Sequence, residues 1–146
     1  MTRRQILLAS TDELAPRAGE LFAQLDDQIE VQVVSNGSEC IEKYIRLSKE
    51  ESKPAVVIID YDFPKVSGGH LASSIRGIER GLGLSVCAII LRCTQGESDD
   101  VARVIPELGR AVQLTRRDEY TAEQQLKRLV KASAKVLTQL KGRSRK

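Results

Sequence analysis

Five short apolar runs, each followed by a segment with helical periodicity, constrain the fold of this chain more than any other feature. The third run, Ala55–Ile59, is rich in β-branched residues and lies between Pro54 and a turn that contains Pro64. It does not alternate with polar residues, which is typical of a strand covered on both faces. The predicted strands are residues 5–9, 30–34, 55–60, 86–91 (or 86–93) and 111–114.

Strict alternation of strands and helices predicts parallel strands, right-handed crossovers and helices on both faces of the sheet. We expect the first helix to begin near Asp12, where it would accommodate Pro16 in its first turn. The last helix carries the clearest apolar stripe, formed by Leu126, Leu129, Val130, Val136, Leu137 and Leu140. The predicted fold class is therefore α/β, a (βα)5 doubly wound sheet, as one domain over residues 1–146 with a frayed basic tail at 141–146.

Composition excludes several classes of protein. Hydrophobic residues make up 41% of the chain and charged residues 29%, and no apolar stretch is long enough to span a bilayer. No signal-peptide pattern follows Met1, so we expect a cytoplasmic protein. The net charge is only +3, and the chain has no tryptophan, three tyrosines and two phenylalanines, which argues against nucleic-acid binding. The odd set Cys40, Cys87 and Cys93 has no metal-like or redox-like spacing.

Asp60 is the strongest candidate for a functional residue, because it ends the third apolar run. In open α/β sheets the chemistry lies at the carboxyl ends of the strands. Aspartate is also common there for a simpler reason, since its side chain bonds nearby backbone amides in turns. The simple explanation accounts less well for the whole loop, which also holds Asp62, Pro64 and the pair Gly68-Gly69.

The chain resembles the receiver domains of two-component response regulators. The likeness lies mainly in residues 60–71 (DYDFPKVSGGHL), which resemble the phosphoacceptor loop and the start of the third helix, and in residues 34–39 (VSNGSE). The resemblance implies a flavodoxin-like sheet with strand order 2-1-3-4-5. It also implies transfer of a phosphoryl group from a histidine kinase or phosphotransfer protein to an aspartate beside Mg²⁺. Separately, Ser10, Thr11 and Thr94 have no predicted histidine partner, so we expect no catalytic residues of the hydrolase kind.

The resemblance assigns a role to each matching residue. Asp60 matches the phosphoacceptor, and Asp62 matches the position whose backbone carbonyl ligates the metal ion. Thr94 matches the hydroxyl that reorients toward the phosphate, and Arg116 stands where the family has a lysine. Arginine keeps the charge of lysine but offers a larger planar group.

The main departure from the family lies at the end of the first strand, where receivers carry two acids. The ungapped match places Ser10 and Thr11 there, and neutral hydroxyls are poor Mg²⁺ ligands, so metal binding and phosphorylation would both be weak. A two-residue slide would instead bring Asp12 and Glu13 into the site. It would leave the inward face of the strand unchanged, because side chains alternate with period two.

The resemblance therefore favours a stand-alone, atypical receiver that acts by binding a downstream protein, through the face formed by residues 101–140. Phosphorylation of Asp60 and phosphorylation-independent binding are both open, and a homodimer through the same face is an alternative assembly. A small flavin-binding electron carrier is the rival from another class. It is disfavoured because residues 10–13 (STDE) hold no glycine and carry two acids.

Overall fold

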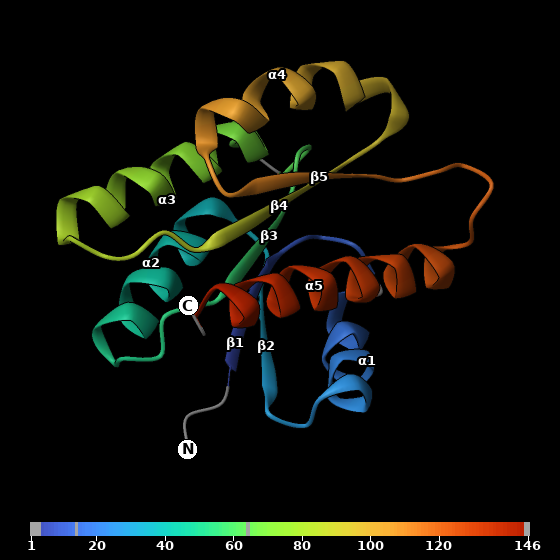
Figure 1. The fold of residues 1–146 in the computed structure, drawn as a ribbon. Coiled ribbons are helices and arrows are strands. Elements are labelled where there is room, and N and C mark those ends of the chain that lie inside the picture. The colour runs from blue at the N-terminus through green and yellow to red at the C-terminus, as the bar shows by residue number, and fades with distance from the viewer. Residues whose placement is uncertain (1–3, 14, 64, 145–146) are drawn as a thin grey trace.

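The computed structural model describes residues 4–13, 15–63 and 65–144. Across these residues the chain forms a five-stranded parallel sheet of order β2-β1-β3-β4-β5. The predicted flavodoxin-like α/β fold is therefore confirmed, including the strand order (Figure 1). The strands are β1 (Arg4–Ala9), β2 (Ile29–Val34), β3 (Val56–Asp60), β4 (Ala88–Cys93) and β5 (Ala111–Thr115).

Helices cover both faces of the sheet. α1 and α5 pack on one face, and α2, α3 and α4 pack on the other (Figure 1). Each face has its own apolar core, and β3 contributes to both because all five of its residues are buried. The helices are α1 (Ala18–Leu25), α2 (Gly37–Lys49), α3 (Gly68–Leu82), α4 (Ser98–Leu108) and α5 (Ala122–Ser144), with short 3-10 turns at Ala15–Arg17 and Gln95–Glu97.

Helix boundaries follow from local chemistry at several points. Asn36 caps α2 by accepting a hydrogen bond from the Glu39 amide at 2.8 Å. Ser67 caps α3 in the same way, through the amide of His70. α3 ends at Gly83, whose φ of 66° places it in the left-handed region that glycine adopts without strain. α4 ends at Leu108, with Gly109 as its C-cap.

The start of the first helix was predicted wrongly. α1 begins at Ala18, and Pro16 lies in the preceding 3-10 turn instead of the first turn of a helix that starts near Asp12. The reason is tertiary: the Ser10 hydroxyl accepts a hydrogen bond from the Asp12 amide while it contacts the neighbouring strands. Leu14 and Pro64 lie outside the described residues.

Two other boundaries bear on the functional prediction. β4 starts at Ala88 and continues to Cys93, so the longer of the two predicted C-terminal limits for this strand is the observed one. The segment 141–146, predicted as a frayed tail, overlaps α5 at residues 141–144, and Arg145 and Lys146 lie outside the described residues. Within the described residues, no helix combines the length and the apolar composition needed to cross a membrane.

Gly68 fits its position because it has no side chain. A β-carbon there would lie 2.7 Å from the Asp60 carbonyl oxygen and 2.7 Å from the Tyr61 α-carbon, and both are backbone atoms. The Gly68 amide also donates to the Tyr61 carbonyl at 2.8 Å, which closes the loop after β3. This close approach holds the start of α3 against the end of the strand that carries Asp60.

We expect Gly68→Ala to lower the free energy of unfolding by about 1–3 kcal/mol, because the backbone must move to admit the methyl group. The matched control is Gly77→Ala in the middle of the same helix, where an added β-carbon meets no atom within 4 Å. That change should stabilise the protein by about 0.5–1 kcal/mol through helix propensity. Urea denaturation of both variants measures the difference, and equal effects would contradict the steric argument.

A buried polar network lies on the α2–α3–α4 face. Glu79 accepts hydrogen bonds from Arg76 at 2.7 Å, from the Tyr44 hydroxyl at 2.8 Å and from the Cys87 amide at 2.7 Å. Arg76 in turn donates to the carbonyls of Leu108 at 2.7 Å and Gly109 at 2.9 Å. The network therefore joins α2, α3 and the start of β4 to the turn after α4.

The three cysteines are free and buried. Burial raises the pKa of the Cys40 thiol to about 12 and that of Cys87 to about 11. These thiols therefore stay protonated at neutral pH and act as packing residues.

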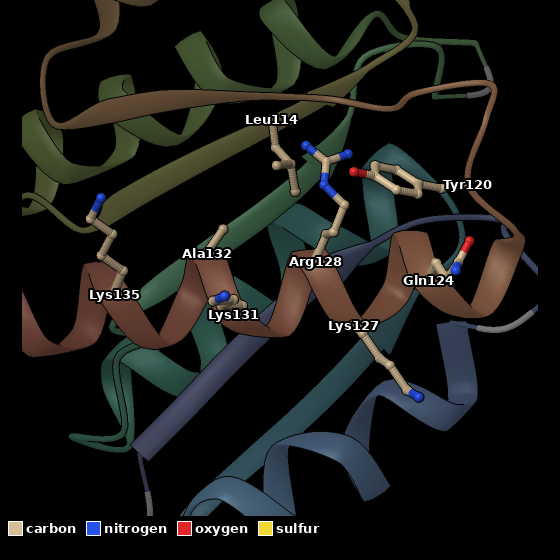
Figure 2. Close-up of a pocket in the computed structure, with 8 residues that line it drawn as sticks. All are labelled: Leu114, Tyr120, Gln124, Lys127, Arg128, Lys131, Ala132 and Lys135. Carbon is tan, nitrogen blue, oxygen red and sulfur yellow. The ribbon is translucent and has the colours of Figure 1, made fainter.

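A groove of about 580 Å³ lies between β5 and α5 (Figure 2). Leu114 from β5 and Ala132 from α5 provide apolar parts of its lining. Tyr120, from the loop between them, packs under the Arg128 guanidinium, with 5.1 Å between the guanidinium carbon and the ring centre. The remaining lining residues are Gln124, Lys127, Lys131 and Lys135.

Candidate functional site

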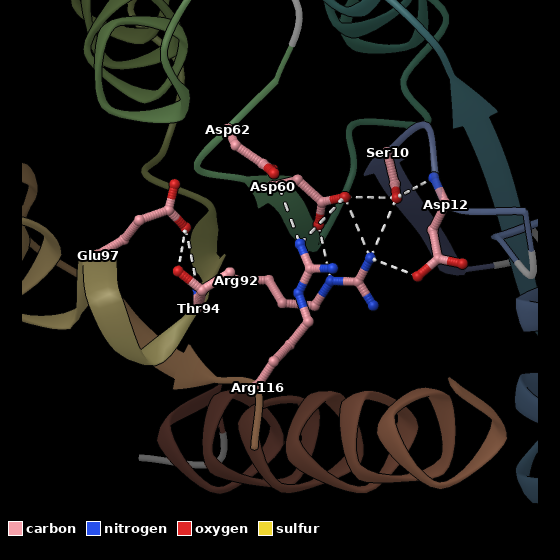
Figure 3. Close-up of polar contacts among 8 residues, drawn as sticks. All are labelled: Ser10, Asp12, Asp60, Asp62, Arg92, Thr94, Glu97 and Arg116. Carbon is pink, nitrogen blue, oxygen red and sulfur yellow. Dashed lines mark hydrogen bonds and ion pairs between the residues drawn. The ribbon is translucent and has the colours of Figure 1, made fainter. Parts of the chain in front are cut away.

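Asp60 lies at the carboxyl edge of the sheet, where the order of strands reverses around β1 and β3. Its side chain is only 5% exposed, although it ends a strand beside a loop. In the parallel register Ala9 pairs with Ile59, and Asp60 pairs with Arg92. The ends of β1, β3 and β4 therefore bring Ser10, Asp60 and Arg92 together (Figure 3).

Arg92 binds the Asp60 carboxylate through two nitrogens. Its Nε donates to Oδ1 at 2.7 Å, and its Nη2 lies 3.1 Å from Oδ2. The Ser10 hydroxyl donates to the same Oδ2 at 2.5 Å. Both carboxylate oxygens are therefore used by hydrogen bonds within the protein, in the two-point geometry that guanidinium groups favour.

The guanidinium of Arg92 also contacts the segment after β1. Its Nη2 lies 3.1 Å from the Ser10 hydroxyl and 3.3 Å from the Asp12 carboxylate (Figure 3). The Arg92 side chain is 3% exposed. Burial by itself lowers the pKa of Arg92, but the hydrogen bond and charge of Asp60, together with Asp12, outweigh it and raise the pKa. The group is therefore a permanent buried cation.

Arg116, at the end of β5, adds a second positive charge at the rim of the site. Its Nη2 lies 4.0 Å from Asp60 Oδ2 and 3.7 Å from Asp62 Oδ1. The Asp62 side chain is 57% exposed and points toward this arginine (Figure 3). Arg116 Nε is buried and has no hydrogen-bond partner among the described residues.

Thr94 follows β4 on the same edge of the sheet, but its hydrogen bonds lead away from Asp60. Its hydroxyl donates to Glu97 at 3.1 Å, and its amide donates to the same carboxylate oxygen at 2.9 Å. Both groups belong to the turn that opens α4. In this structure Thr94 therefore holds the start of α4, and Figure 3 shows no bond between Thr94 and the Asp60 carboxylate.

The structure also places the four residues after β1. β1 ends at Ala9, and the Ser10 hydroxyl donates a hydrogen bond to Asp60. Ser10 therefore takes the position that the ungapped match assigns to it, without the two-residue slide. The Asp12 carboxylate contacts Arg92, and the Asp12 amide donates to the Ser10 hydroxyl at 3.1 Å. Thr11 and Glu13 are exposed, and within the described residues neither forms a hydrogen bond or an ion pair with Asp60.

Arg92 is the site residue that the sequence reasoning missed. The sequence does contain a signal for it. Arg92 is the one charged residue among residues 88–93, and a strand that continued to Cys93 would place it in the buried sheet. An arginine in a buried strand needs an acidic partner. The strand that ends in Asp60 pairs with β4 and supplies this acidic partner.

The arrangement does not fit a divalent cation beside Asp60. Hard cations such as Mg²⁺ are bound through oxygen atoms, usually those of one or two carboxylates that are free to coordinate, together with several waters. Here the guanidinium of Arg92 lies between the carboxylates of Asp60 and Asp12, and the Ser10 hydroxyl donates a hydrogen bond to Asp60. Within the described residues, no three His, Cys, Asp or Glu side chains are grouped so that they could hold a metal ion.

No protein-family model and no curated protein matches this sequence. Solved structures do match. A response regulator receiver domain protein from Clostridium thermocellum superposes with a TM-score of 0.66 at 20% identity, over 94% of this chain and 97% of that one. The phosphorylated cyanobacterial phytochrome response regulator RcpA has a TM-score of 0.66 at 21% identity, over 89% and 90%. The Mn²⁺-bound form of the response regulator Rcp1 has a TM-score of 0.64 at 18% identity, over 88% and 90%.

These structures superpose on 88–94% of this chain. At these identities the likeness concerns the fold, and it agrees with the resemblance that the sequence carries around Asp60. The chain therefore has the fold of the receiver domains of two-component response regulators.

Proposed function

We propose that this chain is a single receiver-like domain that transmits a signal by binding a partner protein, and not by catalysing a reaction. The partner binds the face formed by α4, β5 and α5, within residues 101–140. The observation that carries the proposal is the β5–α5 groove, which combines an apolar lining with a row of exposed lysines that form no ion pair with an acid among the described residues.

The apolar part of the groove extends along β5. This strand is the edge of the sheet and pairs only with β4. Val112 and Leu114 are two residues apart and therefore share one face of the strand. α5 covers this face incompletely, because Val112 remains 43% exposed. Exposed apolar side chains beside a groove are typical of a surface that binds another protein.

The charged part of the groove lies on α5. Lys127, Lys131 and Lys135 are exposed and recur every four residues, so they form one row with about 6 Å between neighbours. Within the described residues, no carboxylate forms an ion pair with any of the three. The acid of the first turn of α5, Glu123, pairs with Arg17 of the 3-10 turn before α1.

An apolar lining beside unneutralised lysines favours an acidic, amphipathic helix as the binding segment of the partner. Nucleic acid fits less well. Tyr120 is the one aromatic residue in the lining, and the Arg128 guanidinium covers a face of its ring, so no row of free rings is available for base stacking. The upstream partner is a histidine kinase or phosphotransfer protein if the chain takes part in a phosphorelay.

A labelled synthetic peptide of four helical turns, with leucines on one face and glutamates elsewhere, tests the proposal. We expect it to bind the ¹⁵N-labelled full chain and to shift amide resonances around Leu114, Tyr120 and Ala132. The triple variant Lys127→Glu/Lys131→Glu/Lys135→Glu should weaken binding roughly tenfold or more, because three attractive charge pairs become repulsive. Fluorescence anisotropy measures the affinity.

The matched control is Arg46→Glu/Lys49→Glu/Arg80→Glu, which changes the net charge equally at exposed positions on α2 and α3. A peptide of the same composition in scrambled order controls for amphipathicity. Equal weakening by both triple variants would show binding through net charge alone and would contradict the proposal. Tighter binding of an oligo-dT probe at the same lysines would favour a nucleic-acid module, and sedimentation of a dimer that the α5 variant dissociates would favour a second copy of the chain.

A further inference from the structure

The cationic group beside Asp60 is part of the chain itself. We propose that Arg92 is a built-in counter-ion that takes the place of a divalent cation, so that Asp60 is not phosphorylated and the state of the site does not depend on metal. The inference rests on the proposed function, because it concerns how a receiver-like binding module is regulated. It differs from the resemblance to receivers, in which the corresponding charge is supplied by Mg²⁺.

The first argument is the hydrogen bonding of Asp60. A nucleophilic carboxylate must present a free oxygen lone pair to the incoming phosphorus atom. Oδ1 accepts a hydrogen bond from Arg92 Nε at 2.7 Å, and Oδ2 accepts from Ser10 at 2.5 Å and from Arg92 Nη2 at 3.1 Å. The two bonds to Oδ2 occupy both of its lone-pair directions, and the charge-assisted bond from Arg92 withdraws electron density from Oδ1, so both oxygens are weaker nucleophiles than those of a free carboxylate.

The second argument is the position of the guanidinium. It contacts Asp60 on β3, and Ser10 and Asp12 after β1, which are the two segments that would supply metal ligands. A cation of charge +2 placed there would lie against a fixed charge of +1, and the two carboxylates nearby, Asp60 and Asp12, are already bonded to that guanidinium. Electrostatic repulsion, and a neutral Ser10 hydroxyl where receivers carry an acid, both act against metal binding.

The third argument concerns the connection from Asp60 to the binding face. Thr94 is the residue whose hydroxyl would move toward a phosphate, and its hydroxyl and amide are both bonded to Glu97 at the start of α4. Arg116 at the end of β5 lies within 4.0 Å of Asp60 and 3.7 Å of Asp62. The contact that links the site to β5 is therefore already formed without phosphate, and the Thr94 hydroxyl is bonded at the start of α4 and not at Asp60, so we expect the face to be available constitutively.

The experiment compares the wild-type chain with Ser10→Asp/Arg92→Met. The variant adds the missing carboxylate and removes the guanidinium, with a side chain of similar length and no charge. Each protein is incubated with acetyl phosphate, with and without Mg²⁺, and analysed by intact-mass spectrometry. In a productive reaction an Asp60 oxygen forms a bond to phosphorus, the bond from phosphorus to the acetyl oxygen breaks, and acetate leaves.

We expect the wild type to gain no phosphoryl mass and to show no change in thermal midpoint on addition of Mg²⁺. The variant should be stabilised by Mg²⁺ in a concentration-dependent way, because the ion binds only the folded state. It should also gain one phosphoryl group in Mg²⁺, which the further change Asp60→Asn abolishes. Phosphorylation of the wild type at Asp60, or an Mg²⁺-dependent stabilisation that Asp60→Asn removes, would overturn the proposal.

The variant can be unstable without metal, since its acids are buried, so Arg92→Met/Asp60→Asn is made as well. This pair removes both charges and should fold with and without Mg²⁺, and it should show no response to the ion. A folded Ser10→Asp/Arg92→Met protein that ignores Mg²⁺ would also overturn the claim that Arg92 takes the place of the ion. Peptide binding to the β5–α5 groove is measured separately, so loss of that activity would contradict the proposed function and leave the role of Arg92 standing.

Discussion

Replacing Arg92 with methionine should lower the free energy of unfolding by about 3–5 kcal/mol at neutral pH. The guanidinium and the Asp60 carboxylate are 3% and 5% exposed and lie 2.7 Å apart. Removal of the cation leaves a buried carboxylate whose close partner is the Ser10 hydroxyl, and desolvation of an unpaired charge is costly. Chemical denaturation in urea measures the change.

Two controls separate the buried pair from a general effect of removing an arginine. Arg103→Met removes an arginine that is 78% exposed and pairs with Asp100 at 3.7 Å, and it should change stability by no more than about 0.5 kcal/mol. The double variant Arg92→Met/Asp60→Asn should recover most of the lost stability, because neither charge remains buried alone. If Arg92→Met behaved like Arg103→Met, the pair would contribute little to the fold.

Replacing Glu79 with glutamine should destabilise the protein by a similar amount, about 3–5 kcal/mol, through the second buried network. The carboxylate accepts from Arg76 on one oxygen and from Tyr44 and the Cys87 amide on the other. Glutamine has one acceptor oxygen, and its NH₂ group would face donors. Glu107→Gln on the exposed face of α4 is the matched control and should be nearly neutral.

The pH dependence of stability gives this variant a second readout. Burial by itself raises the pKa of Glu79, but hydrogen bonds from Cys87, Arg76 and Tyr44 outweigh it and lower the pKa below its ordinary value of 4.5. As the pH falls below 4.5, the unfolded chain takes up this proton before the folded chain does, so stability is lost through the interval down to the folded pKa. Glu79→Gln should remove this contribution to the acid slope, and an unchanged slope would contradict the assignment.

Local pattern was enough to predict a parallel α/β sheet, and the resemblance to receivers supplied its strand order. Each strand of a parallel sheet is an apolar run whose limits depend on neighbouring residues, and all five predicted runs became strands. The carboxyl end of the third run, at Asp60, follows from the same information, because a strand carries its last residue to the edge of the sheet. The caps at Asn36 and Gly109 also follow from local chemistry, since turn chemistry acts over a few residues.

The partners of Asp60 depend on contacts between distant segments. Arg92 is 32 residues away in the chain and Ser10 is 50 residues away, and they meet only because β1, β3 and β4 are adjacent and in register. The start of α1 was mispredicted for a related reason, because Ser10 bonds across the sheet instead of opening a helix. The sequence by itself determined which segments form the sheet and where Asp60 lies. The tertiary structure decided that the cation facing Asp60 is Arg92, since the identity of a neighbour is a property of strand order and register and not of local pattern.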